Sequence, residues 1–245
     1  YRKDQLKMGN SGLKQHYETA KKTGTLKLSQ GKLDEFPQNL RALAPILRAL
    51  DLSENKFVQI PDEIGNFTLL KQLNLGHNKL TSLPEALGEL TKLESLNVSS
   101  NQIKSIPWAL SKLTRLKQVN LSDNRITEFP PMFCDLKFLD VLDLSKNRIT
   151  TIPDAAGALH VVELNLNQNQ ILTISEKLAE CPRLKTLRLE ENCLQLTAIP
   201  SKILKDSKVS VLSAEGNLFE MKQFANLDGY DNYMERYTAV KKKMF

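Results

Sequence analysis

The sequence predicts an α/β solenoid built from short, stacked coils, and three observations lead to that prediction. Asparagine recurs along the chain with successive gaps of 23, 23, 23, 23, 22, 23 and 25 residues. An apolar frame of constant spacing precedes each asparagine, and a proline follows most of them six residues later. A fixed period of roughly 20–50 residues is typical of solenoids. The periodic asparagines are Asn55, Asn78, Asn101, Asn124, Asn147, Asn169, Asn192 and Asn217.

The apolar frame predicts one short strand in each coil. In the coil that ends at Asn78, Leu73 and Leu75 alternate with Asn74, so the leucines face the interior and Asn74 faces outward. A single strand cannot cover its own apolar face, so neighbouring coils stack and share one core. We therefore expect a curved parallel sheet on the concave side.

The periodic asparagines are predicted to be structural. An amide side chain carries both donors and acceptors, so each asparagine can satisfy turn backbone groups of its own coil and of the next. Losing such a partner leaves a buried polar group, at a cost of about 1–3 kcal/mol.

The second half of each coil is predicted to be a turn with a short helical or 3₁₀ segment on the convex side. Proline fixes φ and lacks an N–H donor, and a 23-residue coil leaves little room for a full helix. Ser175 replaces the proline in the sixth coil, and Pro200 comes two residues late in the seventh. The regular prolines are Pro61, Pro84, Pro107, Pro130 and Pro153.

The two ends depart from the repeat, as solenoid caps do. Residues 8–24 are expected to form a capping helix, because Leu13, Tyr17 and Ala20 recur at helical spacing. Residues 25–217 then hold about eight to nine coils, the first with glycine in place of asparagine.

Residues 218–245 are predicted to form a C-terminal cap with an aromatic core, helical from about Tyr230 onward. Residues 1–7 look foreign to the rest of the chain, and we interpret them as a leftover of cloning or of an upstream fusion. On that interpretation the natural start is Met8, followed by Gly9.

The coil pattern Leu-x-x-Leu-x-Leu-Ser-x-Asn-x-Ile-x-x-Ile-Pro resembles the intracellular leucine-rich repeats of Ras-pathway scaffold proteins. The resemblance covers the chain after Lys7, and its most specific motifs lie in residues 187–194, 215–220 and 229–236. It implies a leucine-rich repeat solenoid that acts as a protein-binding adaptor, and it suggests a myristoylated amino terminus. It implies no activity or defined ligand.

Enzyme chemistry is not expected. His16, His77 and His160 occupy unrelated positions of the repeat and lack metal-ligand spacing. The outward carboxylates Asp51 and Asp143 lie several coils apart, and no phosphate-binding loop or nucleophile motif is present. We therefore expect no catalytic residues, no metal and no cofactor.

Charge and composition give little support to nucleic-acid binding. The formal net charge is +6, and it falls to +4 without residues 1–7, which hold three basic residues and one acidic residue. Single-strand binders combine basic grooves with stacking aromatics, and the outward strand positions carry no aromatic residue. The partner is expected to be a protein or peptide, and the chain a monomer.

The cysteines favour a cytoplasmic protein. Cys134, Cys181 and Cys193 lie inside the repeats, whereas secreted members of the resembled family staple their caps with paired cysteines. No apolar run approaches the ~20 residues that a membrane-spanning helix needs.

The predicted partner-binding site is the concave face. Outward strand positions stack about 4.8 Å apart. The periodic asparagines form a second row, here called the asparagine ladder, and a basic edge of Lys56, Lys79, Arg125 and Arg148 directly follows it. A partner segment is expected to lie from Asn74 to Asn165, with an acidic portion against the basic edge; the alternative is a merely solvated polar face. The outward column is Asp51, Asn74, Asn97, Asn120, Asp143, Asn165 and Arg188, flanked by Ser53, Ser99, Ser122 and Ser145.

A second candidate surface lies on the convex side. Directly after proline, other coils carry acidic residues, but the third and fourth carry Trp108 and Pro131, and Met132 follows. These three would form an apolar patch, and such patches often serve as interaction sites. The alternative is that Trp108 folds back over its neighbours as core.

Gly9 is the third candidate site. After removal of Met8 it would offer an acceptor for myristate, although Leu13 occupies the Ser/Thr position of the consensus. One myristoyl chain binds membranes only marginally, at about 10⁴ M⁻¹, so reversible association with the cytoplasmic leaflet is expected. The alternative is a purely cytosolic regulatory adaptor without a lipid anchor.

Overall fold

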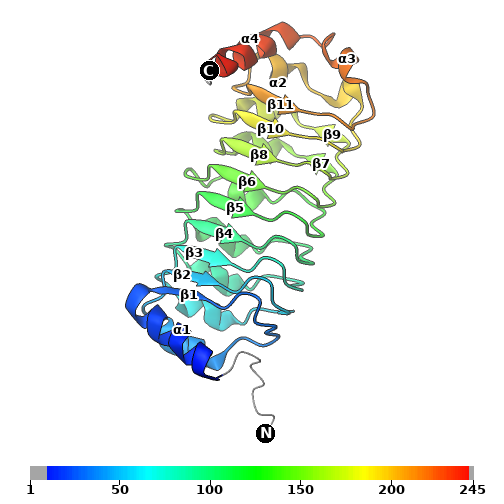
Figure 1. Cartoon of the computed structure of the whole chain (residues 1–245). Coiled ribbons are helices and arrows are strands. Elements are labelled where there is room, and N and C mark those ends of the chain that lie inside the picture. Colours follow the sequence, from blue (N-terminus) through cyan, green and yellow to red (C-terminus); the bar gives the residue numbers. More distant parts are fainter. Residues whose placement is uncertain (1–9, 243–245) are drawn as a thin grey trace. The chain divides into compact units, whose positions relative to one another are not determined.

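The structure, a computed structural model, describes residues 10–242, and the chain divides into two compact units after Leu116. Gly9 and the residues before it lie outside this range. In both units each coil contributes one short strand, a turn and, in most coils, a short 3₁₀ helix, labelled η (Figure 1).

The first unit contains α1, four parallel strands and four 3₁₀ helices. Its strands pair in sequence order, from β1 through β4. The elements are α1 (Asn10–Thr23), β1 (Thr25–Lys27), η1 (Gln38–Leu43), β2 (Ala49–Asp51), η2 (Asp62–Asn66), β3 (Gln72–Asn74), η3 (Glu85–Glu89), β4 (Ser95–Asn97) and η4 (Trp108–Lys112).

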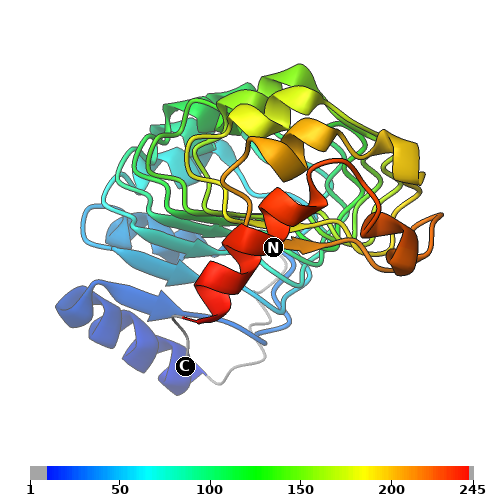
Figure 2. The ribbon, with the colours of Figure 1, turned by 90° about the horizontal axis from the view of Figure 1, so that it is seen from above.

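The second unit begins at Lys117 and continues the same plan, with strands on one side and short helices on the other (Figure 2). Its main strands, β5, β6, β8, β10 and β11, are parallel, and β7 pairs with β9 beside them. The elements are β5 (Gln118–Asn120), η5 (Pro131–Phe133), β6 (Val141–Asp143), β7 (Thr151–Ile152), η6 (Asp154–Ala158), β8 (Glu163–Asn165), β9 (Thr173–Ile174), η7 (Glu176–Glu180), β10 (Thr186–Arg188), η8 (Leu196–Ala198), α2 (Ser201–Lys205), β11 (Val211–Ser213), α3 (Met221–Phe224) and α4 (Tyr230–Lys241). The predicted parallel strands and 3₁₀ segments are confirmed.

The core of each unit consists of the frame residues. Leu73 and Leu75 are buried, while Asn74 between them is only half-buried, as the alternation predicts. The prolines stand just before the 3₁₀ helices in an extended conformation: Pro84 precedes η3 and has a ψ of 147°. Where proline is missing, Ser175 takes over, because its side chain accepts a hydrogen bond from Lys177 N and so caps η7.

The periodic asparagines join adjacent coils through their side chains. Nδ2 of Asn78 donates to Leu52 O at 3.0 Å, Leu75 O at 3.0 Å and Gly76 O at 3.2 Å, and its Oδ1 accepts from Phe57 N at 3.1 Å. Phe57 and Leu52 belong to the preceding coil, so one side chain satisfies backbone groups of two coils. The structural role predicted for these asparagines is confirmed.

Helices cover the described ends of the repeat. In α1, Ala20 is fully buried and Tyr17 is half-buried, and burial raises the pKa of the Tyr17 phenol. At the other end, Phe224 and Tyr233 form a core cluster with Ile199 and Leu204. The helix α4 begins at Tyr230, as the sequence predicts.

Arg236 of α4 ties the C-terminal cap to the last coils. Its guanidinium donates to four backbone carbonyls, those of Ile203, Leu204, Lys205 and Val209, at 3.4, 2.6, 3.3 and 2.9 Å. Most of these carbonyls lie in or next to α2, where the last helical carbonyls have no intrahelical donor. Burial lowers the pKa of Arg236 from its usual value.

Candidate functional site

The predicted concave column is in register within each unit. In the first unit Asp51, Asn74 and Asn97 lie opposite one another on β2, β3 and β4. In the second unit the register joins four residues on neighbouring strands, Asn120, Asp143, Asn165 and Arg188. All seven side chains are half-buried rather than fully exposed.

The half-burial has a specific cause, because each outward Asn or Asp caps the turn after its own strand. Oδ1 of Asn74 accepts from Gly76 N at 3.1 Å, and Oδ1 of Asn97 accepts from Ser99 N at 3.0 Å. Asn120, Asp143 and Asn165 make the same bond two residues ahead. This is the local turn in which Asn and Asp side chains bond the backbone two residues on.

The turn bond also fixes which side-chain atoms remain for a partner. Because a backbone N–H needs an acceptor, the amide oxygen is held at the turn and the NH₂ group is directed away from it. In residues 10–242, the amide nitrogens of Asn74, Asn97, Asn120 and Asn165 have no hydrogen-bond partner. The concave face of each unit thus presents free amide donors, with a carboxylate beside them in each unit.

Most of the flanking serines contribute little to this surface. Ser53, Ser99 and Ser145 are buried, and only Ser122 is half-exposed. The hydroxyls of Ser53 and Ser145 donate to Asp51 and Asp143 at 2.6 and 2.7 Å. Three of the four serines that flank the column are therefore buried, and Ser122 keeps part of its surface.

Arg188 ends the column as an ion pair. Its Nε donates to Glu163 Oε1 at 2.8 Å, and both side chains are partly buried. Glu163 is itself an outward residue of β8, one strand away. A partner at this end of the second unit therefore meets a neutralised pair rather than a free cation.

The basic edge consists of exposed side chains in both units. Lys56 and Lys79 belong to the first unit, and Arg125 and Arg148 to the second. In the described part of the chain none of the four has an ion pair. Each unit therefore keeps two uncompensated cations next to its asparagine ladder.

The convex candidates separate into exposed and buried residues. Trp108, the first residue of η4, is 63% exposed, so the alternative of a core tryptophan is wrong. Pro131 is exposed too, in the second unit. Met132 is only 7% exposed, which corrects its predicted place in the patch. The second position after proline is already half-buried in the coils of Glu63, Ala86 and Ala109, and the long apolar side chain of Met132 packs inward there.

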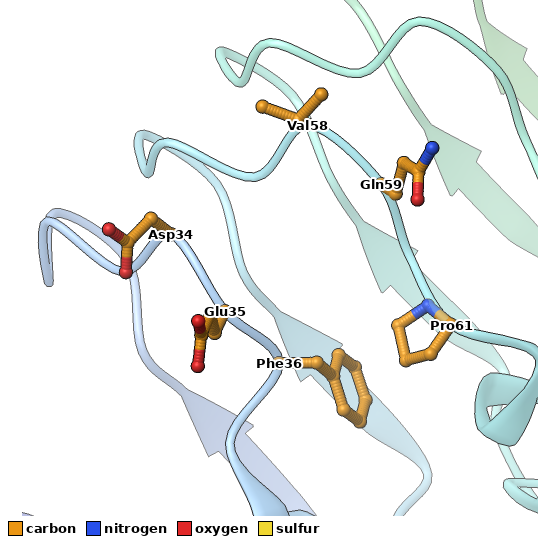
Figure 3. Close-up of a pocket in the computed structure, with 6 residues that line it drawn as sticks. All are labelled: Asp34, Glu35, Phe36, Val58, Gln59 and Pro61. Carbon is orange, nitrogen blue, oxygen red and sulfur yellow. The ribbon is translucent and has the colours of Figure 1, made fainter. Parts of the chain in front are cut away.

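A shallow opening of about 380 Å³ lies in the first unit between its first two coils (Figure 3). It is lined by Asp34, Glu35 and Phe36 from one coil and by Val58, Gln59 and Pro61 from the next. The Phe36 ring is fixed edge-on against Phe67, with centroids 6.3 Å apart. Sequence reasoning missed this feature, which suits one partner side chain rather than an enclosed ligand.

The described residues contain no group of three or more His, Cys, Asp or Glu side chains placed to hold a metal ion. Cys134 and Cys181 are buried, and burial raises their pKa values to about 11 and about 12, so both stay protonated at neutral pH. A thiol needs its thiolate form to act as a nucleophile.

Within residues 10–242 no helix is long and apolar enough to cross a bilayer.

The profile of the family described as "Leucine rich repeat" matches residues 45–103, 91–149, 114–171 and 139–194. The chain belongs to the leucine-rich repeat family. The matched segments together run from the coil of Asn55 to the coil of Asn192, and they leave out both caps.

Solved leucine-rich repeat structures have a similar fold. An internalin from Listeria monocytogenes is 25% identical over 84% of this chain, with a TM-score of 0.68. The plant peptide hormone receptor RGFR1, in complex with RGF2, is 28% identical over 79%, with a TM-score of 0.67. PEPR1–AtPEP1 is 28% identical over 76%, with the same TM-score. The present chain spans 58%, 32% and 27% of these proteins.

Proposed function

We propose that this leucine-rich repeat protein is a non-enzymatic interaction scaffold that holds a protein or peptide partner on its concave strand face. The observation that supports this most strongly is the set of free amide donors on β3, β4, β5 and β8. Because the turn holds each amide oxygen, these donors are pre-oriented, which lowers the ordering cost of binding.

The partner is proposed to present carbonyl or carboxylate oxygens. Amide N–H groups need acceptors, and the adjacent Lys56 and Lys79, or Arg125 and Arg148, attract negative charge. An extended segment with acidic side chains meets both requirements. Similar solved structures support the choice of a peptide, since one is a peptide hormone receptor in complex with RGF2.

The experiment compares two concave variants with one convex control. Asn97→Arg and Asn120→Arg place a bulky cation on the strand face of either unit, whereas Asn66→Arg places it on the exposed end of η2. The unaltered chain and each variant are tagged, and the proteins that each recovers from a cell extract are quantified by mass spectrometry. We expect a set that both concave variants lose and the Asn66 variant keeps. Equal recovery by all variants, each folded by circular dichroism, would sink the proposal.

The basic edge has its own test. Lys79→Glu reverses one charge and should weaken recovery of the same proteins, while raising the salt concentration should weaken recovery by the unaltered chain, because exposed charges are screened beyond about 10 Å at 0.1 M salt. Partners that bind equally in low and high salt would show that the acidic portion does not exist.

We also propose that the protein reaches membranes through myristoylation of Gly9, which lies outside the described residues. The exposed Lys21 and Lys22 in the last turn of α1 support this, since each basic residue near an anionic leaflet adds about 1 kcal/mol. Glu18 offsets part of it through its ion pair with Lys21 at 2.8 Å.

Intact-mass spectrometry of a chain that starts at Met8, co-expressed with an N-myristoyltransferase, tests the anchor. We expect a gain of one myristoyl group that vanishes in Gly9→Ala. An unmodified chain leaves the second candidate, a purely cytosolic, monomeric regulatory adaptor.

The motifs in residues 187–194, 215–220 and 229–236 further support a relationship to leucine-rich repeat-containing protein 57 as part of this proposal.

A further inference from the structure

Trp108, on the convex side of the first unit, occupies a position that is acidic in the two preceding coils. It is the first residue of η4, directly after proline, and the same position holds Asp62 in η2 and Glu85 in η3. Asp62 and Glu85 are exposed, and so is Trp108, at 63%. The exposed indole therefore lies in a row whose other two members, Asp62 and Glu85, are acidic.

The 3₁₀ helices of the first unit carry excess negative charge. The helices η1–η4 contain four acidic residues, Asp62, Glu63, Glu85 and Glu89, and two basic ones, Arg41 and Lys112, which leaves a balance of −2. Both cations are already paired, Arg41 with Glu63 and Lys112 with Glu89. The uncompensated carboxylates are therefore Asp62 and Glu85, the two that share the register of Trp108.

Glu85 is held next to the tryptophan by a backbone contact. Its Oε2 accepts a hydrogen bond from Ala109 N at 3.2 Å, and Ala109 directly follows Trp108. The two helices pack closely, since a Cβ atom on Gly88 would lie 2.7 Å from the Cβ of Ala109. The second carboxylate oxygen of Glu85 makes no hydrogen bond within residues 10–242.

We propose that Trp108 and Glu85 form a docking site for an arginine or lysine side chain of a basic partner segment. A cation is attracted to the face of an indole, and a guanidinium can stack on the ring while it donates to a nearby carboxylate. Arginine fits better than lysine, because its plane matches the ring and its aliphatic stem covers apolar surface. The negative balance of η1–η4 selects a basic rather than an acidic or apolar segment.

This site is independent of the concave face. It uses the opposite side of the coils, different residues and a partner of opposite charge. A single protein with acidic and basic segments, or two different proteins, can therefore occupy the two faces.

Trp108 is the only tryptophan of the chain, so its emission reports on the site directly. The probe is a tetra-arginine peptide blocked at both ends, titrated into the full chain at low salt, with the uncharged tetra-citrulline peptide as the matched control. We expect a saturable change in Trp108 emission with arginine, absent with citrulline and weakened by added salt.

Variants separate this site from general attraction of basic peptides. Glu85→Gln is expected to weaken the apparent affinity about two- to fivefold, the range of an exposed cation–π or ion-pair contact. Glu54→Gln removes an exposed carboxylate after β2 in the same unit and should leave the affinity unchanged. By calorimetry, Trp108→Leu should weaken binding similarly, whereas Trp108→Phe retains part of it.

The proposal is overturned by any of three results: no saturable change in emission, an equal change with the citrulline peptide, or equal weakening by Glu54→Gln and Glu85→Gln. Circular dichroism of each variant should match that of the unaltered chain, because all of these side chains are exposed or half-exposed. None of these results bears on the recovery of concave-face partners.

Discussion

Replacing Asn78 by alanine tests how strongly one buried side chain couples two coils. The substitution removes four hydrogen bonds, and two of them join groups of the preceding coil, Phe57 N and Leu52 O. Phe57 is fully buried, so its N–H has no access to water in the folded protein. Each buried group left without a partner costs about 1–3 kcal/mol.

Only Phe57 N is left without a partner, because Leu52 O keeps the hydrogen bond from Asn55 Nδ2 at 3.0 Å. The stranded N–H costs about 1–3 kcal/mol and the lost bond to Leu52 O adds about 0.5–1.5 kcal/mol, so we expect about 2–4 kcal/mol in total. For a chain of this size, 1 kcal/mol shifts the melting temperature by about 2–4 °C. The expected loss in melting temperature is therefore roughly 4–16 °C. A loss of about 2–4 kcal/mol in the free energy of unfolding is a large share of the 5–15 kcal/mol by which native proteins are typically stable.

The assay is urea and thermal unfolding followed by far-ultraviolet circular dichroism. Asn66→Ala is the matched control, because Asn66 lies one coil earlier in the sequence, at the exposed end of η2, and it should change stability by less than about 0.5 kcal/mol. If Asn78→Ala and Asn66→Ala unfold at the same urea concentration, the side chain does not couple the coils and the reasoning is refuted.

Two further predictions concern the second unit. Arg236→Lys should lower stability by about 1–3 kcal/mol and release amide-exchange protection in α2 and α4, because an ammonium cannot reach four carbonyls; unchanged protection would contradict this. Cys134 and Cys181 should resist iodoacetamide in the native state, while Cys193 reacts. Burial raises the folded pKa values of Cys134 and Cys181 to about 11 and about 12, so the free energy of unfolding should fall as pH rises above about 9. A free energy of unfolding that stays constant over that range would contradict the assigned burial.

The sequence by itself determined the backbone plan of this protein. A 23-residue period with leucines at alternating positions leaves few ways to bury the apolar side chains, so strands such as β3 and the register of Asn74 with Asn97 follow from spacing alone. The asparagine ladder was equally predictable, since a buried amide at the end of each strand must bond the nearby backbone.

Only the tertiary structure decided what each surface side chain offers a partner. The spacing places Asn74 outward, but the turn bond to Gly76 N decides that its donor and not its acceptor is free. Trp108 and Met132 occupy neighbouring positions of the same pattern, yet one is exposed and the other buried. The physical reason is that periodicity sets the direction of the backbone, whereas side-chain exposure depends on contacts with groups far away in the sequence.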